Sequence, residues 1–185
     1  MRRIAEQIGS APTSIYWYVS DKNELYELMV DSVIGEIGLP AGPTGDWRAD
    51  LSSIAWATLA AMRRHRWFSQ LGIQPVPGPG TLRYATAVLR CLSGSGLDET
   101  TAISVLATLN NYTFGFIQRE AAWQRLTSMA AADGIDRRPR PGDGPLSDQG
   151  LSARLRLADD ASFTFGLDRF LDGIAVLIDR GAEAG

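Results

Sequence analysis

Apolar residues recur at spacings of three and four along most of this 185-residue chain, which predicts amphipathic helices. The clearest run lies over residues 23–37, where Asp21 and Glu24 form a capping-box pattern at its start. Its predicted inward stripe consists of Leu25, Leu28, Met29, Val33 and Ile37. Three glycines and two prolines in residues 38–46 end this helix. We therefore divide the chain into a module of residues 1–40 and a larger domain of residues 41–185.

Four helices are expected in the larger domain, over residues 47–65, 82–92, 99 into the 120s, and 161–180. Asp46 and Asp98 are the predicted N-caps of the first and third. The first turns Trp47, Leu51, Ile54, Ala55, Thr58 and Met62 inward, the second Leu82, Ala85, Val88, Leu89 and Leu92, and the last Phe163, Leu167, Phe170, Ile174, Leu177 and Ile178. The third is apolar almost all round over residues 103–117, which is typical of a central, buried helix.

The remaining sequence adds no strand. Residues 132–150 combine Pro, Gly, Asp and Arg without periodicity, which predicts a mobile surface loop. No strand-like alternation of useful length occurs, so the predicted fold class is all-α. No apolar run approaches the roughly 20 residues that cross a bilayer, and we expect a cytoplasmic protein without a membrane partner.

Composition limits the chemistry that this chain can perform. A single cysteine and a single histidine exclude an intrachain disulfide and a structural zinc site, and no cofactor is expected. An enzyme would have to use Cys91 or a serine as nucleophile, with His65 as the one imidazole base. No nucleophile elbow, phosphate loop or metal motif is present, so catalysis ranks last among the candidate functions. The formal net charge of -3 means that any DNA contact must come from a local patch.

The first 20 residues have the pattern of a helix-turn-helix unit. Ile4, Ala5 and Ile8 form an inward face, Gly9 permits the positive φ that ends the first helix, and Pro12 suits the first turn of the next. The side chains left facing outward or sideways are Thr13, Ser14, Tyr16, Trp17 and Tyr18. Hydroxyls and ring edges placed in this way can contact phosphates or a thymine methyl group. The competing interpretation, in which the three aromatics pack on a core, is weaker for this pattern.

The stretch "RRIAEQIGSAPTSIYWYVSDKNELYELMVD" closely resembles the DNA-binding region of tetracycline-repressor (TetR) family transcriptional regulators. The resemblance implies that Thr13, Ser14, Tyr16 and Tyr18 contact bases and phosphates, that Lys22 contacts a phosphate, and that Arg2 or Arg3 contacts the groove edge. "RRHRWF" and "FTFGLDRFLDGI" carry a weaker likeness to the C-terminal domain of the tetracycline-repressor branch.

Family members carry a further helix before this unit, so we expect upstream in-frame sequence that specifies an amphipathic helix of about 15 to 20 residues. Residues 1–40 hold three basic and six acidic side chains, which is a poor balance for binding DNA. The alternative to a complete regulator is therefore a truncated one that dimerises and binds ligand without holding DNA.

The resemblance also implies a homodimer, in which the last helix joins its counterpart in a four-helix bundle. Gly166, Phe170, Gly173 and Leu177 form the predicted dimerisation stripe, although a core helix of a single chain would show the same spacing. A two-fold dimer presents its reading helices about 34 Å apart, so the operator should be palindromic.

A small-molecule effector completes the predicted regulator, which we expect to be a repressor released from DNA by that effector. His65 coincides with a drug-binding histidine of tetracycline repressors, but it equally suits a helix C-terminus. Asn111 stands where a second histidine would be, so we expect a largely apolar effector rather than a metal-tetracycline chelate. Besides His65, the pocket candidates are Trp56, Phe68, Tyr84, Cys91, Asn111, Phe114 and Gln118.

Overall fold

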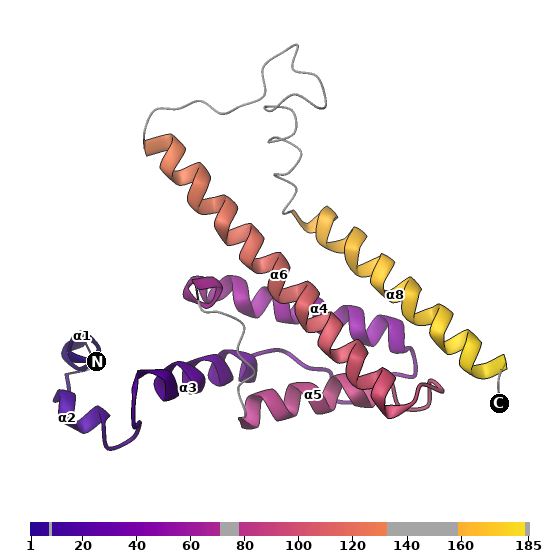
Figure 1. The fold of residues 1–185 in the computed structure, drawn as a ribbon, viewed down its shortest axis with the longest axis horizontal. Helices are drawn as coiled ribbons and strands as arrows, with labels where there is room; N and C mark the ends of the chain where they lie inside the picture. The colour runs from indigo at the N-terminus through magenta and orange to yellow at the C-terminus, as the bar shows by residue number, and fades with distance from the viewer. Residues whose placement is uncertain (8, 71–77, 133–158, 184–185) are drawn as a thin grey trace, which may run out of the picture.

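The computed structural model describes residues 1–7, 9–70, 78–132 and 159–183 (Figure 1). Every regular element in these ranges is a helix, which confirms the all-α prediction. The elements are α1 (Arg2–Gln7), α2 (Pro12–Ile15), α3 (Lys22–Gly35), α4 (Trp47–Arg64), the 3₁₀ helix η1 (Arg66–Gln70), α5 (Pro79–Cys91), α6 (Glu99–Ala132) and α8 (Asp160–Glu183). The expected loop over residues 132–150 lies almost wholly outside the described residues.

Side-chain caps fix the starts of three helices where the sequence predicts them. Asp21 accepts hydrogen bonds from the N–H groups of Asn23 and Glu24, Asp46 from Ala49, and Asp98 from Thr101. The reciprocal half of the predicted capping box is displaced by one residue, because the Glu24 carboxylate accepts from the N–H and hydroxyl of Ser20.

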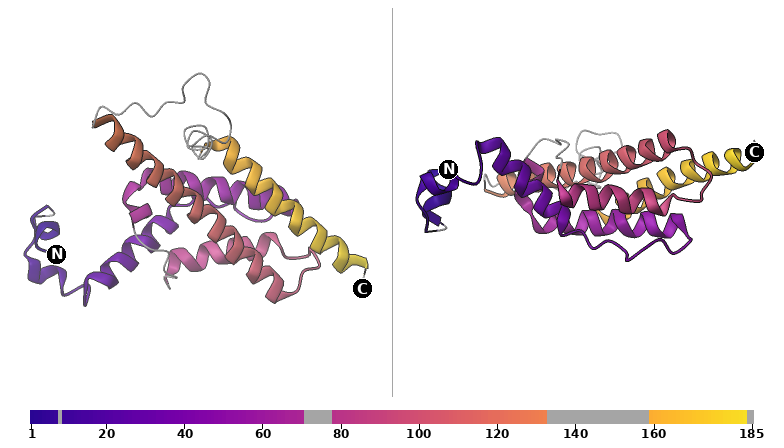
Figure 2. Two further views of the ribbon diagram at one scale, coloured as in Figure 1. Left: turned by 45° about the horizontal axis from the view of Figure 1, so that its top comes forward. Right: turned by 90° about the horizontal axis from the view of Figure 1, so that it is seen from below.

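The helices form a layered body with a small head at one end. In Figure 1, α6 runs diagonally across α4 and α5, and α8 lies along one flank of α6. The two further views agree that α1 and α2 stand apart from this body at the outer end of α3 (Figure 2). The C-terminal half of α3 packs on α5, and its Val33 and Ile34 belong to the core of the larger domain. A single helix thus connects the head to the body.

Ring packing around Phe163 holds α8 to the body. Phe163 is fully buried, and its ring centroid lies 4.8 Å from that of Trp56, 5.0 Å from that of Phe116 and 5.3 Å from that of Tyr112. Leu167, Leu171 and Ile174 continue this buried face. The predicted face included Phe170 in place of Leu171, but Phe170 is half-buried, as is Ile178, and Leu177 is exposed.

Two predicted stripes differ from the structure. Helix α5 begins at Pro79, three residues before the predicted start, because proline suits the first turn of a helix. Its buried face consists of Tyr84, Val88 and Cys91, whereas Leu82 is 69% exposed. In α3 the predicted inward Leu28 is exposed. Helical periodicity alone could not choose between neighbouring apolar faces of such short helices.

The prediction that α6 is a central, buried helix holds for only part of its surface, although the helix contacts α4, α5, η1 and α8. Leu109, Thr113 and Phe116 face the core, but Ile103 is exposed, as are Ala107, Asn111 and Gly115 at the following four-residue steps. Helix α6 therefore has one outward face. No helix in the described ranges is long and apolar enough to span a membrane.

We predict that replacing Phe163 with Ala lowers the free energy of unfolding by about 3–5 kcal/mol, because three ring contacts are lost and a cavity remains. Urea unfolding followed by circular dichroism measures this change. The matched control is Leu82→Ala on exposed α5 surface, which should change stability by less than about 0.5 kcal/mol. Equal effects of the two substitutions would contradict the packing described for α8.

Candidate functional site

The small head contains the predicted turn between two helices. Gly9, between α1 and α2, adopts a φ of 66°, as expected from the sequence. Ala5 and Val19 are buried between the short helices, and Ile15 is half-buried. Pro12 lies in the first turn of α2, also as predicted. The local helix-turn-helix pattern is therefore present in residues 2–35.

The outward surface of the head is aromatic and hydroxylated. Trp17 is 88% exposed and Tyr18 is 84% exposed, and Tyr16 and Thr13 are also exposed. The alternative in which the three aromatics pack on a core is wrong within the described structure. These aromatics lie in the turn after α2, which ends at Ile15. Turn hydrogen bonds that span three residues follow, from the N–H of Trp17 to the carbonyl oxygen of Ser14 and from the N–H of Tyr18 to that of Ile15.

Basic residues begin α1 and α3, the helices that precede and follow this surface in the chain. Lys22 begins α3 and is exposed, with its ammonium 5.0 Å from the centroid of the Tyr26 ring. Arg2 and Arg3 begin α1, and Arg3 is exposed. Ser14 is half-buried between the two helices. Hydroxyl, aromatic and cationic groups are thus gathered at the outer end of α3, a combination suited to phosphates and base edges.

A buried carboxylate connects α3 to the body. Asp31 accepts hydrogen bonds from the N–H groups of Gly80 at 3.0 Å and Thr81 at 2.8 Å, in the first turn of α5. The local N-cap residue, Gly78, has no side chain to perform this role, so α3 supplies the cap of α5 from 49 residues away in sequence. A Cβ atom at Gly78 or Gly80 would overlap Asp31, so only glycine permits this approach. We call this contact the Asp31 cap.

The cap also changes the acidity of Asp31. Burial raises the pKa of the Asp31 carboxyl, but the N–H groups of Thr81 and Gly80 stabilise its charged form. The hydrogen bonds outweigh burial, and the pKa lies below its usual value. The charged carboxylate is therefore the form that the folded protein holds.

A second set of contacts joins the end of α3 to the end of α4. His65 is the C-cap residue of α4, and its Nε2 lies 2.7 Å from Oε2 of Glu36. Arg64 Nη2 lies 3.6 Å from the same oxygen. The hydrogen bond from His65 lowers the pKa of the Glu36 carboxyl. Of the two interpretations left open for His65, its position at the helix end is the one that these contacts support.

The predicted effector residues separate into different environments. Phe68 and Phe114 stack with ring centroids 5.7 Å apart, whereas Trp56 packs against Phe163. Gln118 is half-buried. Asn111 is exposed and does not join the group, because its position on α6 falls on the outward face.

Three buried side-chain oxygens on α5 and α6 have no hydrogen-bond partner among the described residues. They are Thr81 Oγ1, Tyr84 Oη and Asn110 Oδ1. Burial raises the pKa of Tyr84 to about 12, so the phenol keeps its proton. Cys91 is buried too, and burial raises the pKa of its thiol, which fits an inert side chain. Orphaned interior atoms of this kind are available to a bound molecule.

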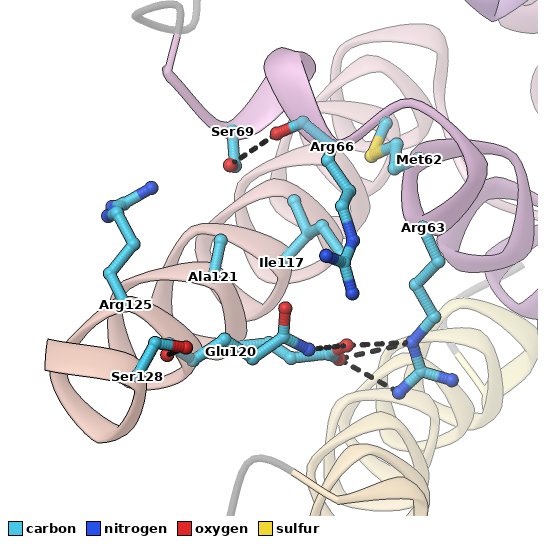
Figure 3. Close-up of a pocket in the computed structure, with 10 residues that line it drawn as sticks. Met62, Arg63, Arg66, Ser69, Ile117, Glu120, Ala121, Arg125 and Ser128 are labelled. Carbon is cyan, nitrogen blue, oxygen red and sulfur yellow. Dashed lines mark hydrogen bonds and ion pairs between the residues drawn. The ribbon is translucent and has the colours of Figure 1, made fainter. Parts of the chain in front are cut away.

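The structure also contains a groove that sequence reasoning missed. It has a volume of about 610 Å³ and lies between the end of α4, η1 and the second half of α6 (Figure 3). Its lining residues are Met62, Arg63, Arg66, Ser69, Ile117, Glu120, Ala121, Gln124, Arg125 and Ser128. The available signal was the cluster of arginines in "RRHRWF", which the sequence alone did not place near the later part of α6.

One wall of this groove is fixed by ion pairs. Arg63 Nη2 lies 2.8 Å from Oε2 of Glu120 on α6 and 2.8 Å from Oδ1 of Asp160 at the start of α8. The two carboxylates outweigh the effect of burial, so the pKa of Arg63 is raised. Arg63 thus joins three helices and closes the end of the groove nearest α8.

The head, the single connecting helix and the grooved helical body together define a one-component transcriptional regulator. Comparison with known proteins identifies its family, because residues 39–178 match the model described as the tetracyclin repressor-like C-terminal domain. The chain belongs to the TetR family, whose members are transcriptional regulators and not enzymes.

Relatives support this assignment along the whole chain. The chain is 32% identical over 199 residues to the HTH-type transcriptional repressor DrrR1 of Streptomyces coeruleorubidus, covering 100% of this chain and 73% of that protein. A possible TetR family regulator of Streptomyces coelicolor A3(2) is 27% identical, with a TM-score of 0.68 and coverage of 95% and 88% of the two chains. The Streptomyces coelicolor TetR family protein ActR, solved in complex with (S)-DNPA, has a TM-score of 0.68 at 20% identity and covers 93% and 84%.

We predict that Asp31→Asn lowers the free energy of unfolding at pH 7 by about 1–3 kcal/mol, because the charged cap of α5 is lost. Since the folded pKa of Asp31 is lowered, its contribution is present above the unfolded pKa of about 3.9 and disappears as pH falls through the folded value. Urea unfolding of both proteins between pH 7 and pH 3 should show the difference shrinking towards acid. Glu27→Gln, on the exposed side of α3, is the control; a difference that persists in acid would contradict the charged cap.

Proposed function

We propose that this TetR-family regulator is a ligand-released repressor that works as a homodimer on a palindromic operator in the cytoplasm. Residues 1–40 form the DNA-reading module, and residues 41–185 bind the effector and dimerise. The observation that carries the proposal is the exposed Tyr16–Trp17–Tyr18 surface at the free end of a helix whose other end is locked into the body. Repressor action is also what the name of the DrrR1 relative states for that protein.

DNA contact is assigned to the predicted reading residues of the head, of which Thr13, Tyr16, Trp17 and Tyr18 are exposed and Ser14 is half-buried. Thr13, Ser14, Tyr16, Trp17 and Tyr18 face base edges and neighbouring phosphates, and Lys22 with Arg2 or Arg3 neutralises phosphates at the border. The N–H groups at the start of α3 are already partly used by Asp21, so the Lys22 ammonium carries the contact at that point.

Dimer formation is assigned to the outward face of α8. Phe165 is 65% exposed, and Val176 and Leu177 are exposed on the same helix. A Cβ at Gly173 would meet nothing within 4 Å, so a partner helix can approach there. Gly166 has a different role, because a Cβ there would overlap the Tyr112 ring of its own chain. Phe170 is half-buried and lies between the two environments.

Effector binding is assigned to the region between α4, η1, α5 and α6. The unpartnered Tyr84 and Asn110 oxygens supply polar atoms within apolar surroundings, the usual composition of small-molecule sites, and the groove at the end of α4 supplies a volume for a ligand. ActR, which shares the fold, has been solved with a small molecule bound. An effector that fits one arrangement of α3 better than another shifts the spacing of the two heads and weakens DNA binding.

Operator binding is tested by fluorescence anisotropy on DNA from upstream of the gene, across a salt series. We expect Lys22→Gln to weaken binding to all sequences and to reduce the slope of log K against log salt by about 1.8, since the dimer loses two phosphate contacts at about 0.9 each. Arg90→Gln, on exposed α5 surface, is the charge-matched control and should leave the slope unchanged.

Absence of salt-dependent binding in this assay would overturn the DNA-reading proposal and favour a regulator that only dimerises and binds ligand.

Dimerisation is tested by sedimentation velocity. The double substitution Phe165→Glu and Leu177→Glu places like charges on the exposed face of α8 and should convert the dimer to monomer at micromolar concentration. Leu82→Glu, an equally exposed apolar residue on α5, should leave the dimer intact. A wild-type monomer, or a dimer that survives the α8 substitutions, would overturn this assignment.

A further inference from the structure

The groove between η1 and α6 carries positive charge that the described residues do not neutralise. Arg66 and Arg125 are exposed, and neither forms an ion pair within the described parts of the chain. They approach from different elements, Arg66 from η1 and Arg125 from α6 (Figure 3). Arg63, in contrast, is committed to Glu120 and Asp160. Two guanidinium groups therefore remain for a ligand.

The other polar groups of the groove do not compete for the role of donor. The Ser69 hydroxyl donates to the carbonyl oxygen of Arg66, and the Ser128 hydroxyl donates to that of Gln124. The Gln124 amide donates to Glu120. Because both serine hydroxyl protons and one amide proton of Gln124 are already used, Arg66 and Arg125 offer the most donors to an incoming acceptor. Guanidinium groups select planar anions such as carboxylates.

The floor of the groove is apolar. Met62 and Ile117 are almost completely buried beneath it, and Ala121 adjoins them on α6. A volume of about 610 Å³ exceeds what an inorganic ion fills and lies within the range of small-molecule sites. Since the whole chain carries a formal charge of -3, the attraction for an anion is local to this groove.

We propose that the groove binds an amphipathic organic anion, with its apolar body on Met62, Ile117 and Ala121 and its acidic group between Arg66 and Arg125. This inference rests on the proposed function and narrows the effector from a largely apolar molecule to an organic acid with an apolar body. Arg66 directly follows His65, the partner of Glu36 at the end of α3. An anion that neutralises Arg66 therefore binds one residue away from the His65–Glu36 contact, which holds the end of α3.

The test uses two fluorescent probes that share one ring system. 1-Anilinonaphthalene-8-sulfonate carries an anionic group, and N-phenyl-1-naphthylamine is the same molecule without it. Fluorescence titrations of the 185-residue protein measure the dissociation constant of each probe. The wild-type protein should bind the sulfonate at least tenfold more tightly than the neutral probe. Added salt should weaken the binding of the sulfonate and leave that of the neutral probe unchanged.

Two double variants of equal charge make the comparison sharp. Arg66→Gln with Arg125→Gln should weaken the sulfonate about tenfold while changing the neutral probe less than twofold. Arg90→Gln with Arg180→Gln removes two exposed arginines that do not line the groove, and should change neither probe. Circular dichroism and urea unfolding show that each variant is folded.

Each other outcome overturns the proposal. Equal losses for both probes mean that the arginines support the fold of the groove, and an unchanged sulfonate affinity means that the anion does not bind them. Equal effects of the two double variants would show a general charge effect.

The anisotropy assay on upstream DNA, performed with the same proteins, separates this inference from the proposed function. Intact DNA binding with failed probe discrimination rejects the organic acid and keeps the regulator. Probe discrimination without DNA binding keeps the anion site and rejects the DNA-binding repressor.

Discussion

The Asp31 cap is the contact on which the arrangement of this molecule depends. It closes the start of α5 with a carboxylate from α3, so the helix that carries the head also completes a helix of the larger domain. A buried carboxylate is costly unless hydrogen bonds compensate it, and two backbone donors do so here. Displacing α3 along its axis would therefore expose unpaired groups on both helices. The head moves with the body, because separate movement of α3 would break the hydrogen bonds of the Asp31 cap.

The second attachment of α3 differs in strength and exposure. Glu36, His65 and Arg64 meet near the surface, where solvent screens their charges, so each pair contributes little to stability. Weak contacts of this kind can break and reform without unfolding the protein. The connecting helix thus has one firm attachment at α5 and one adjustable attachment at the end of α4, next to the cationic groove. That combination permits rotation about the Asp31 cap rather than free detachment.

Sequence reasoning recovered the elements that depend on local chemistry. Asp21, Asp46 and Asp98 act on their own helices, and Gly9 and Pro12 act on their own turn, so short-range patterns were sufficient. The motif likeness to TetR regulators is confirmed by the family match.

Features that depend on tertiary packing could not be predicted in this way. Asp31, which caps α5, lies 49 residues in sequence from Gly80, whose N–H donates to it. The groove brings together η1 and a part of α6 that lies about 50 residues later. For the same reason the sequence favoured aromatic pocket candidates, since nothing local indicates that Arg66 and Arg125 face one cavity. Helix faces were misassigned for Leu28 and Leu82, where neighbouring apolar positions compete.

The glycines opposite Asp31 have a genetic consequence. A methyl group at position 80 would overlap the backbone of α3, although this position touches neither the reading surface nor the groove. A genetic selection for repressor variants that no longer respond to the effector, or that no longer bind DNA, would therefore recover substitutions at Gly78 and Gly80. These would appear alongside substitutions in the head surface and in the groove. Such alleles would lie at the contact between α3 and α5, outside both sites, and would identify this contact as the place where the two parts of the molecule are coupled.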